Sequence, residues 1–256
     1  MAGRGRGRGV FLNKLNDVAA GNFNRRGVTD ARKDPLNEIL CDIDKLRLGS
    51  SAGELSAITD KCSALSTEYQ LKSVAQHIYD RCLSNIDFIS VGVSLFNSLL
   101  PLQVPDFSQK FRSVVLNLVQ QDFKGRKGIR YVSTEKFACF TSVLCQIFIT
   151  FRIKDKLLSP LVGPVCESLE DLITGDANEI DTLFTQLQDC GKLLQECDAA
   201  RLEQLMMAVR REIIANSKSP RSRSTLLQLV ECHARNWEPL GADISKFYCD
   251  PQVDGL

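Results

Sequence analysis

The sequence predicts an all-α protein in which antiparallel helical pairs stack into a solenoid. From Asp34 onward, apolar residues recur every three or four positions in one segment after another, as on one face of a helix. No segment alternates between apolar and polar residues for long, so we expect no sheet. Breaks rich in Pro, Gly and Ser divide the chain into stretches of about 14 to 22 residues, a common helix length. No exact repeat period is present, and a packed helical bundle is the structural alternative.

Four helices are predicted in the first part of this pattern. The first begins at Asp34 with an Asp-Pro start signal and ends before the Gly-Ser stretch at residues 49–53. The fourth ends at Pro101 and Pro105. The four predicted helices cover residues 34–48, 53–66, 69–83 and 87–100.

Six further helices are predicted in the second part. The second of them has an N-cap signal in Ser-Thr-Glu, and its Phe140 and Phe148 belong to a stripe that we expect in the core, as we do Met206. A polar loop at residues 216–224 precedes the last helix, and the Pro, Gly and Asp of residues 238–243 end it. The predicted ranges are 106–131, 133–153, 157–173, 176–197, 200–214 and 225–237.

Charge and composition divide the chain into four parts. The predicted parts are a disordered Arg/Gly-rich basic arm at residues 1–33, one or two outlying helices with a linker at 34–66, a helical repeat domain at 67–250 and a tail at 251–256. The arm holds eight Lys and Arg against two Asp, a net charge of +6, and the whole chain is +1, so the remainder carries −5. Its Arg4, Arg6 and Arg8 are candidates for RNA contact, with a flexible solubilising arm as the alternative.

The cysteines and histidines do not predict a metal or cofactor site. Ten cysteines include no C-x-x-C pair, and only two histidines are present. We expect reduced, buried thiols, with Cys190 and Cys197 on one apolar stripe. The N-terminus has no apolar core of a signal peptide, and no apolar run is long enough for a membrane span. We therefore expect a cytoplasmic location, with the nucleus as a second one, and no membrane partner.

Motifs of enzymes are absent from the sequence. It has no phosphate loop, no G-x-G-x-x-G after a strand, no nucleophile elbow and no H-E-x-x-H. Cys232 and His233 are adjacent, and neighbours on a helix point about 100° apart, so they do not form a catalytic dyad. The sequence therefore predicts a protein that is not an enzyme.

Two basic features are candidates for partner or RNA binding. Residues 123–131 read FKGRKGIRY, which places Lys124, Arg126, Lys127 and Arg130 between two aromatic residues. The two glycines predict a turn or a frayed helix end, and clustered cations beside aromatics can hold phosphates or acidic peptides. A solvated helix terminus is the alternative.

The second basic feature is the loop at residues 216–224, where serines alternate with Lys and Arg. Its Ser219-Pro220 pair is a candidate phosphorylation site, and a phosphate there would reverse the local charge. A loop that only connects two helices is the alternative interpretation.

The C-terminal stretch predicts a structural cap. We expect Trp237 to anchor the segment that follows the last helix, with Phe247 and Tyr248 folding back over the end of the core.

Four ordered segments resemble the MIF4G domain, the all-helical repeat module named for the middle domain of eukaryotic initiation factor 4G. They are KFRSVVLNLVQQDFKGRKGIR, SVLCQIFITFRIKDKLLSPLVGPVCESL, IDTLFTQLQDCGKLLQECDAARLEQLMMAVRREII and LLQLVECHARNWEPLGADISKFY. The resemblance covers residues 68–250 and is strongest from Phe107 onward. It is closest to the small single-domain members that bind histone stem-loop-binding protein, and to the C-terminal domain of the cap-binding-complex-dependent translation initiation factor.

This resemblance implies a HEAT-like helical-hairpin solenoid that works as a scaffold or adaptor in the regulation of translation initiation. The implied partners are translation factors and mRNA-bound proteins of the stem-loop-binding protein, cap-binding complex or RNA helicase type, and a homodimer is implied by some small members. The alternative is a protein that contacts RNA directly through the basic arm and the basic segment at 123–131.

Overall fold

The fold is all-α, as predicted. The computed structural model describes residues 34–100, 107–215 and 218–238, together with Gly241, Lys246 and Tyr248. All of them belong to one compact unit that begins at Asp34. The α-helices in this part of the chain are α1 Pro35–Lys45, α2 Ala52–Ser63, α3 Glu68–Ser84, α4 Ile89–Leu99, α5 Phe107–Val132, α6 Thr134–Thr150, α7 Val162–Ile173, α8 Ala177–Ala215 and α9 Pro220–Ala234.

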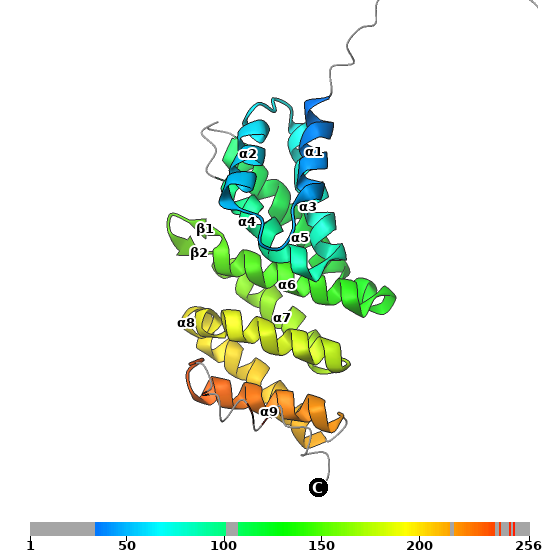
Figure 1. Cartoon of the computed structure of the whole chain (residues 1–256). Coiled ribbons are helices and arrows are strands. Elements are labelled where there is room, and N and C mark those ends of the chain that lie inside the picture. Colours follow the sequence, from blue (N-terminus) through cyan, green and yellow to red (C-terminus); the bar gives the residue numbers. More distant parts are fainter. Residues whose placement is uncertain are drawn as a thin grey trace, which may run out of the picture. The chain divides into compact units, whose positions relative to one another are not determined.

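Most helices pack against the next helix in the sequence. Contacts join α1 to α2, α3 to α4, α5 to α6, α7 to α8 and α8 to α9, and contacts of α6 with α3, α4 and α8 connect one pair to the next. Figure 1 shows α6, α7, α8 and α9 lying in succession below the group formed by α1 to α5. This order is that of the predicted helical-hairpin stack.

Local sequence signals explain where several helices begin. The side chains of Ser51 and Thr67 each accept a hydrogen bond from the backbone N–H three residues later. The side chains of Glu54 and Gln70 in turn accept from the backbone N–H of Ser51 and Thr67, so α2 and α3 start with capping boxes. Ser133 caps α6 through the N–H of Lys136. These caps satisfy backbone donors that have no partner inside the helix.

The core is centred on α6. Its Phe137, Phe140, Leu144 and Phe148 are completely buried, and so is Met206 of α8. Because α6 is buried on most of its circumference, α3, α4, α5 and α8 can all pack around it. The predicted core roles of Phe140, Phe148 and Met206 are confirmed.

The helices of residues 34–66 share this core. Leu36, Ile39 and Ile43 of α1 are buried, and α1 contacts both α2 and α3. Arg81 of α3 donates to the carbonyl oxygens of Ile43 and Leu46, which ties α1 to α3. The predicted arm at 1–33 and the predicted tail at 251–256 lie outside the described residues.

A small hairpin corrects the expectation that the chain has no sheet. Strands β1 Arg152–Ile153 and β2 Lys156–Leu157 pair in antiparallel register between α6 and α7. Lys154 and Asp155 at the turn have φ angles of 49° and 61°, the left-handed conformation that tight two-residue hairpins need. Two-residue strands are too short to show an alternating pattern, so periodicity could not predict them.

The long helix α8 is two helical segments joined at a single residue. Asp198 has φ −157° and ψ 83°, which are not helical, and its side chain caps the second segment by accepting from the N–H of Arg201 at 2.9 Å. The predicted break between 176–197 and 200–214 is confirmed. Cys190 is buried as predicted, whereas Cys197 is exposed because it lies at this break.

The last helix begins earlier than predicted. Ser219 accepts from the N–H of Ser222 and Pro220 occupies the first helical position, so α9 includes residues that were expected in a loop.

In the part of the chain that the structure describes, no helix combines the length and the hydropathy that a membrane span requires.

Candidate functional site

The basic segment at residues 123–131 is a regular helix, not a turn. It forms the C-terminal part of α5, which continues to Val132. The guanidinium of Arg126 lies over the ring of Phe123, 4.4 Å from the centroid, and so reinforces the helix across one turn. The helix persists despite Gly125 and Gly128 because tertiary contacts of its arginines hold it in place.

Arg126 connects α5 to α7. Its Nη2 lies 2.8 Å from a carboxylate oxygen of Glu167, and its Nε lies 2.9 Å from one of Asp171. The Arg126 side chain is only 16% exposed. A guanidinium that binds two carboxylates in this way is committed to packing and is not available to an RNA phosphate.

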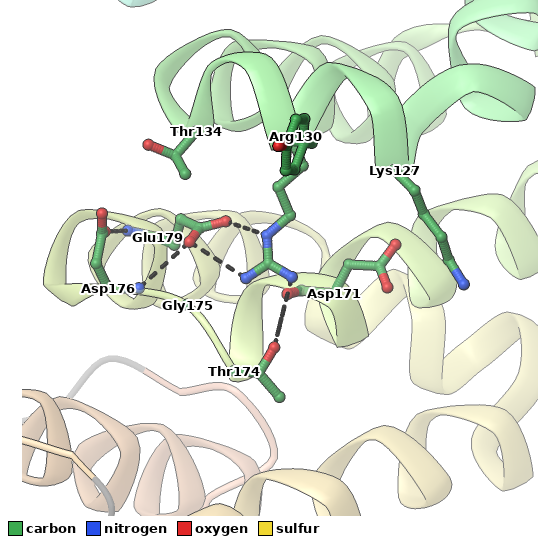
Figure 2. A pocket seen from close by; sticks show the side chains of 9 residues that line it. Lys127, Arg130, Thr134, Asp171, Thr174, Gly175, Asp176 and Glu179 are labelled. Atoms are coloured by element: carbon green, nitrogen blue, oxygen red, sulfur yellow. Dashed lines mark hydrogen bonds and ion pairs between the residues drawn. The ribbon is translucent and has the colours of Figure 1, made fainter.

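Arg130 connects α5 to the start of α8. Its Nε and Nη2 donate to the two carboxylate oxygens of Glu179 at 2.6 and 3.2 Å, and Nη1 donates to Thr174 at 3.4 Å. Figure 2 shows the guanidinium between Glu179 and Thr174. The Glu179 side chain is 4% exposed, so this is a buried ion pair. Glu179 also forms a capping box with Asp176: the Asp176 side chain accepts from the Glu179 N–H, and the Glu179 side chain accepts from the Asp176 N–H.

The two lysines of the segment face solvent. Lys124 and Lys127 are both exposed, and no ion pair joins either of them to a described residue. In Figure 2 the ammonium group of Lys127 makes none of the marked interactions. The four cations of the predicted cluster thus divide into two arginines that hold helices together and two lysines that are accessible.

A shallow cavity of about 700 Å³ lies beside this cluster. It is formed where the C-terminal ends of α5 and α7 meet the start of α8. Tyr131, at its rim, is 93% exposed. The residues that line it are Lys127, Arg130, Tyr131, Thr134, Asp171, Thr174, Gly175, Asp176 and Glu179.

Ser219 is an exposed residue, and its hydroxyl caps α9 by accepting from the N–H of Ser222. Its neighbour Lys218 donates to the carbonyl oxygen of Gly175 at 2.6 Å, and Arg221 donates to Asp181 at 2.9 Å. Phosphorylation of Ser219 stays a prediction.

Trp237 packs onto α8. Its indole N–H donates to Gln195 at 2.9 Å, and its ring lies so close to Gly191 that a Cβ atom there would come within 2.6 Å of it. Both Asn236 and Trp237 have φ near 60°, which turns the chain back toward α8 directly after α9. The edge of His233 meets the indole at 5.6 Å between centroids.

Tyr248 also contacts α9. Its hydroxyl donates to Glu231 at 2.6 Å, and its carbonyl oxygen accepts from the hydroxyl of Ser224 at 3.0 Å. Phe247 lies outside the described residues, as do Arg4, Arg6 and Arg8 of the arm. The role of Trp237 and Tyr248 as a cap stays a prediction that stability measurements can test.

The neighbouring Cys232 and His233 differ in environment. Cys232 is buried, and burial raises the pKa of its thiol. Burial also lowers the pKa of His233, although Glu203 opposes this effect. At neutral pH the thiol is protonated and the imidazole uncharged. Within the described part of the chain, no three His, Cys, Asp or Glu side chains gather closely enough to hold a metal ion.

Sequence reasoning missed the carboxylates that complete the basic cluster. Glu179 had a usable signal, because Asp at 176 followed by Glu three residues later is a capping-box pattern. Glu167 and Asp171 had no such signal. They are ordinary charged residues of α7 until the fold brings that helix beside α5.

Comparisons with known proteins give the chain relatives among translation proteins. A translation initiation factor of Xenopus tropicalis, named as CBP80/20-dependent, is 26% identical over 229 residues, which are 86% of this chain and 39% of that protein. The MIF4G domain-containing protein of Xenopus tropicalis is 28% identical over 186 residues, which are 70% of this chain and 83% of that protein. The protein of the same name from Homo sapiens is 25% identical over 186 residues, which are 70% of this chain and 84% of that protein. No family model matches the chain.

A solved structure supports the fold. The MIF4G domain of Trypanosoma cruzi translation initiation factor EIF4G5 superposes with a TM-score of 0.50 at 17% identity, over 79% of this chain and 96% of that one. At this identity the likeness concerns the fold alone. Together with the named relatives, it confirms the resemblance that the sequence predicted: the chain is similar in sequence to MIF4G domain proteins and has a helical fold of the same kind.

Proposed function

We propose that this chain is a non-enzymatic scaffold in the regulation of translation initiation, joining mRNA-associated proteins to the initiation machinery. The observation that carries the proposal is the similarity over 186 residues to a MIF4G domain-containing protein, of which it spans 83%. The names of a second relative and of the structural neighbour both refer to translation initiation. The chain spans 39% of the first of these, so what the rest of that factor does is not transferred.

The geometry of the described site supports binding over catalysis. Arg126, Arg130 and their carboxylate partners are occupied in holding α5 against α7 and α8. A stack of helices presents long surfaces to peptides and helices of other proteins without needing reactive groups. The proposed partners are of the stem-loop-binding protein, cap-binding complex or RNA helicase type, and a second copy of the chain is an additional one.

Affinity capture of the tagged full chain tests this proposal. Cytoplasmic and nuclear extracts are treated with or without RNase before capture, and bound proteins are quantified by mass spectrometry. We expect initiation factors or mRNA-bound proteins to be enriched in both conditions, since a scaffold holds them by protein contacts. Recovery of none of these proteins would overturn the proposal.

Direct RNA binding is the second candidate, favoured by the exposed Lys124 and Lys127. RNA binding through phosphates falls steeply with salt. Deletion of residues 1–33 and the double change Lys124→Ala, Lys127→Ala should then each weaken binding of a single-stranded RNA and reduce its salt dependence. Unchanged binding in both variants rules out this route.

A further inference from the structure

The ends of five α-helices meet along one face and form a groove. Three adjoining depressions of about 420, 540 and 700 Å³ share lining residues: the first two share Ser84, Glu135 and Cys139, and the last two share Thr134, Asp176 and Glu179. We call this continuous feature the helix-end groove. The C-terminal ends of α3, α5 and α7 and the starts of α6 and α8 line it.

The charge of the groove is negative, most strongly in its middle. Five carboxylates and three cations line its whole length, a net of −2. The middle depression is lined by Glu135, Asp176 and Glu179 and by no Lys or Arg. Of these three, Glu179 is paired with Arg130, whereas Glu135 is exposed and makes no ion pair with a described residue.

Helix N-termini in the groove do not offer an anion site. The start of α6 is capped by Ser133, which accepts from the Lys136 N–H at 3.0 Å. The start of α8 is capped by Asp176, which accepts from the Glu179 N–H at 3.0 Å. Each cap occupies one of the free N–H groups, and the carboxylates of Glu135 and Asp176 beside them disfavour a phosphate.

Apolar surface borders the same groove. Ile86 lines the middle depression and is 53% exposed, and Tyr131 lines the largest one and is 93% exposed. Side chains of Leu83, Ala138 and Cys139 form part of the floor and are nearly buried. Exposed apolar residues beside an acidic channel suit a ligand that has both cationic and apolar side chains.

We infer that the helix-end groove binds an extended, arginine-containing peptide segment of a partner protein. An arginine side chain suits the middle depression, where its planar guanidinium can bind the exposed carboxylate of Glu135 with two parallel hydrogen bonds, and where Asp176 adds negative charge. Apolar neighbours of that arginine contact Ile86, and a second cation can lie over the exposed ring of Tyr131. This inference rests on the proposed scaffold function and adds the chemistry of the partner.

Selection from a library of displayed random peptides tests the inference directly. The full chain is the bait, and selected peptides are measured against the double variant Asp80→Lys, Glu135→Lys. Asp60→Lys is the matched control, because Asp60 is an exposed carboxylate of α2 that does not line the groove. Thermal unfolding of each variant verifies that it is folded.

We expect the selected peptides to be rich in Arg and apolar residues. The groove variant should weaken their binding at least about tenfold, a change of about 1.4 kcal/mol, and the control by less than about twofold. Selection of acidic peptides, of no peptides, or of peptides that bind the groove variant equally well would overturn the inference.

Affinity capture with the same variants separates this inference from the proposed function. If the groove variant still recovers the translation proteins that the unchanged chain recovers, the scaffold proposal stands and the groove is not its binding site. A photo-crosslinking residue at Ile86, with one at the exposed Tyr69 of α3 as control, identifies the bound segment. An acidic crosslinked segment at Ile86 would contradict the inference.

Discussion

Three donors converge on one buried carboxylate at the start of α8. Glu179 accepts from two nitrogens of Arg130 and from the N–H of Asp176. A carboxylate that is withdrawn from water needs such compensation, because an unpaired buried charge is strongly unfavourable. We therefore expect Arg130 to stabilise the fold, although the sequence indicated that its segment is a candidate for binding.

Replacement of Arg130 tests this role. Arg130→Ala should lower the free energy of unfolding by on the order of 3 kcal/mol, since it leaves Glu179 buried without a cation. Lys127→Ala, three residues earlier and exposed, should change it by less than about 0.5 kcal/mol. Urea unfolding measures both variants. Equal effects of the two changes would show that the ion pair contributes little.

Gly191 and Trp237 form a second coupled pair. A Cβ atom at position 191 would lie 2.6 Å from the indole ring, so Gly191→Ala should displace Trp237 and lower the free energy of unfolding by about 1–3 kcal/mol. Trp237→Ala should have an effect of similar size through lost packing and a lost hydrogen bond.

The double variant gives the decisive comparison for this pair. Once Trp237→Ala has removed the ring, Gly191→Ala should stabilise the protein by about 0.5–1 kcal/mol, because alanine is the better helix former. A change of sign between the two backgrounds is the expected result in urea unfolding. If Gly191→Ala has the same effect in both, the indole does not pack on α8 in solution.

At the scale of elements, the C-terminal part of α5 shows how packing overrides a local signal. Gly125 and Gly128 indicate a turn, yet the chain remains helical because Arg126 and Arg130 bind carboxylates on α7 and α8. A Cβ atom at either glycine would meet no other atom within 4 Å. The glycines therefore weaken the helix without serving a close contact.

Replacing these glycines should stabilise the protein. Gly125→Ala and Gly128→Ala should each raise the free energy of unfolding by about 0.5–1 kcal/mol, through helix propensity and a less flexible unfolded chain. Thermal unfolding of the single and double variants measures the effect. Loss of stability in either variant would mean that the segment adopts the turn conformation that the glycines indicate.

The elements that the sequence predicts best are those with long apolar periodicity. The stripe of α6 contains Phe140 and Phe148, and its N-cap and core position follow from the pattern alone. The start of α9 was placed too late, because Ser219-Pro220 was interpreted as part of a loop although it is also an N-cap and first-turn signal. The hairpin at β1 and β2 was missed because two residues cannot display a period.

At the scale of the whole described unit, the helix-end groove could not be predicted. Its carboxylates Asp80, Glu135 and Asp176 lie on α3, on α6 and directly before α8, and are far apart in sequence. These carboxylates come together only because the helix ends stack, and no spacing pattern along the sequence indicates that they are neighbours. The basic cluster, in contrast, was visible because its members lie within one helix, although its ion-pair partners were not.

The reactivity of the cysteines can show whether this unit stays closed in solution. Burial raises the pKa of Cys62, Cys82 and Cys166 to about 12 each, whereas Cys41 of α1 is exposed. In the native protein at neutral pH, a maleimide should modify Cys41 rapidly and those three only when the protein unfolds. Peptide mapping by mass spectrometry follows each site. Rapid modification of Cys166 would show that α7 opens from the stack.

The one-residue break in α8 has a consequence for how this protein can be altered. At Asp198 the chain passes from one helical segment to the next with no intervening loop, and Arg201, three residues later, is fixed to Glu170 of α7 by two hydrogen bonds. Because this connection contains no loop, we expect it not to tolerate inserted residues and to resist cleavage by proteases. Linkers, tags and natural insertions are therefore expected to be accepted elsewhere, for instance at the exposed hairpin turn of Lys154 and Asp155, and rejected at this corner.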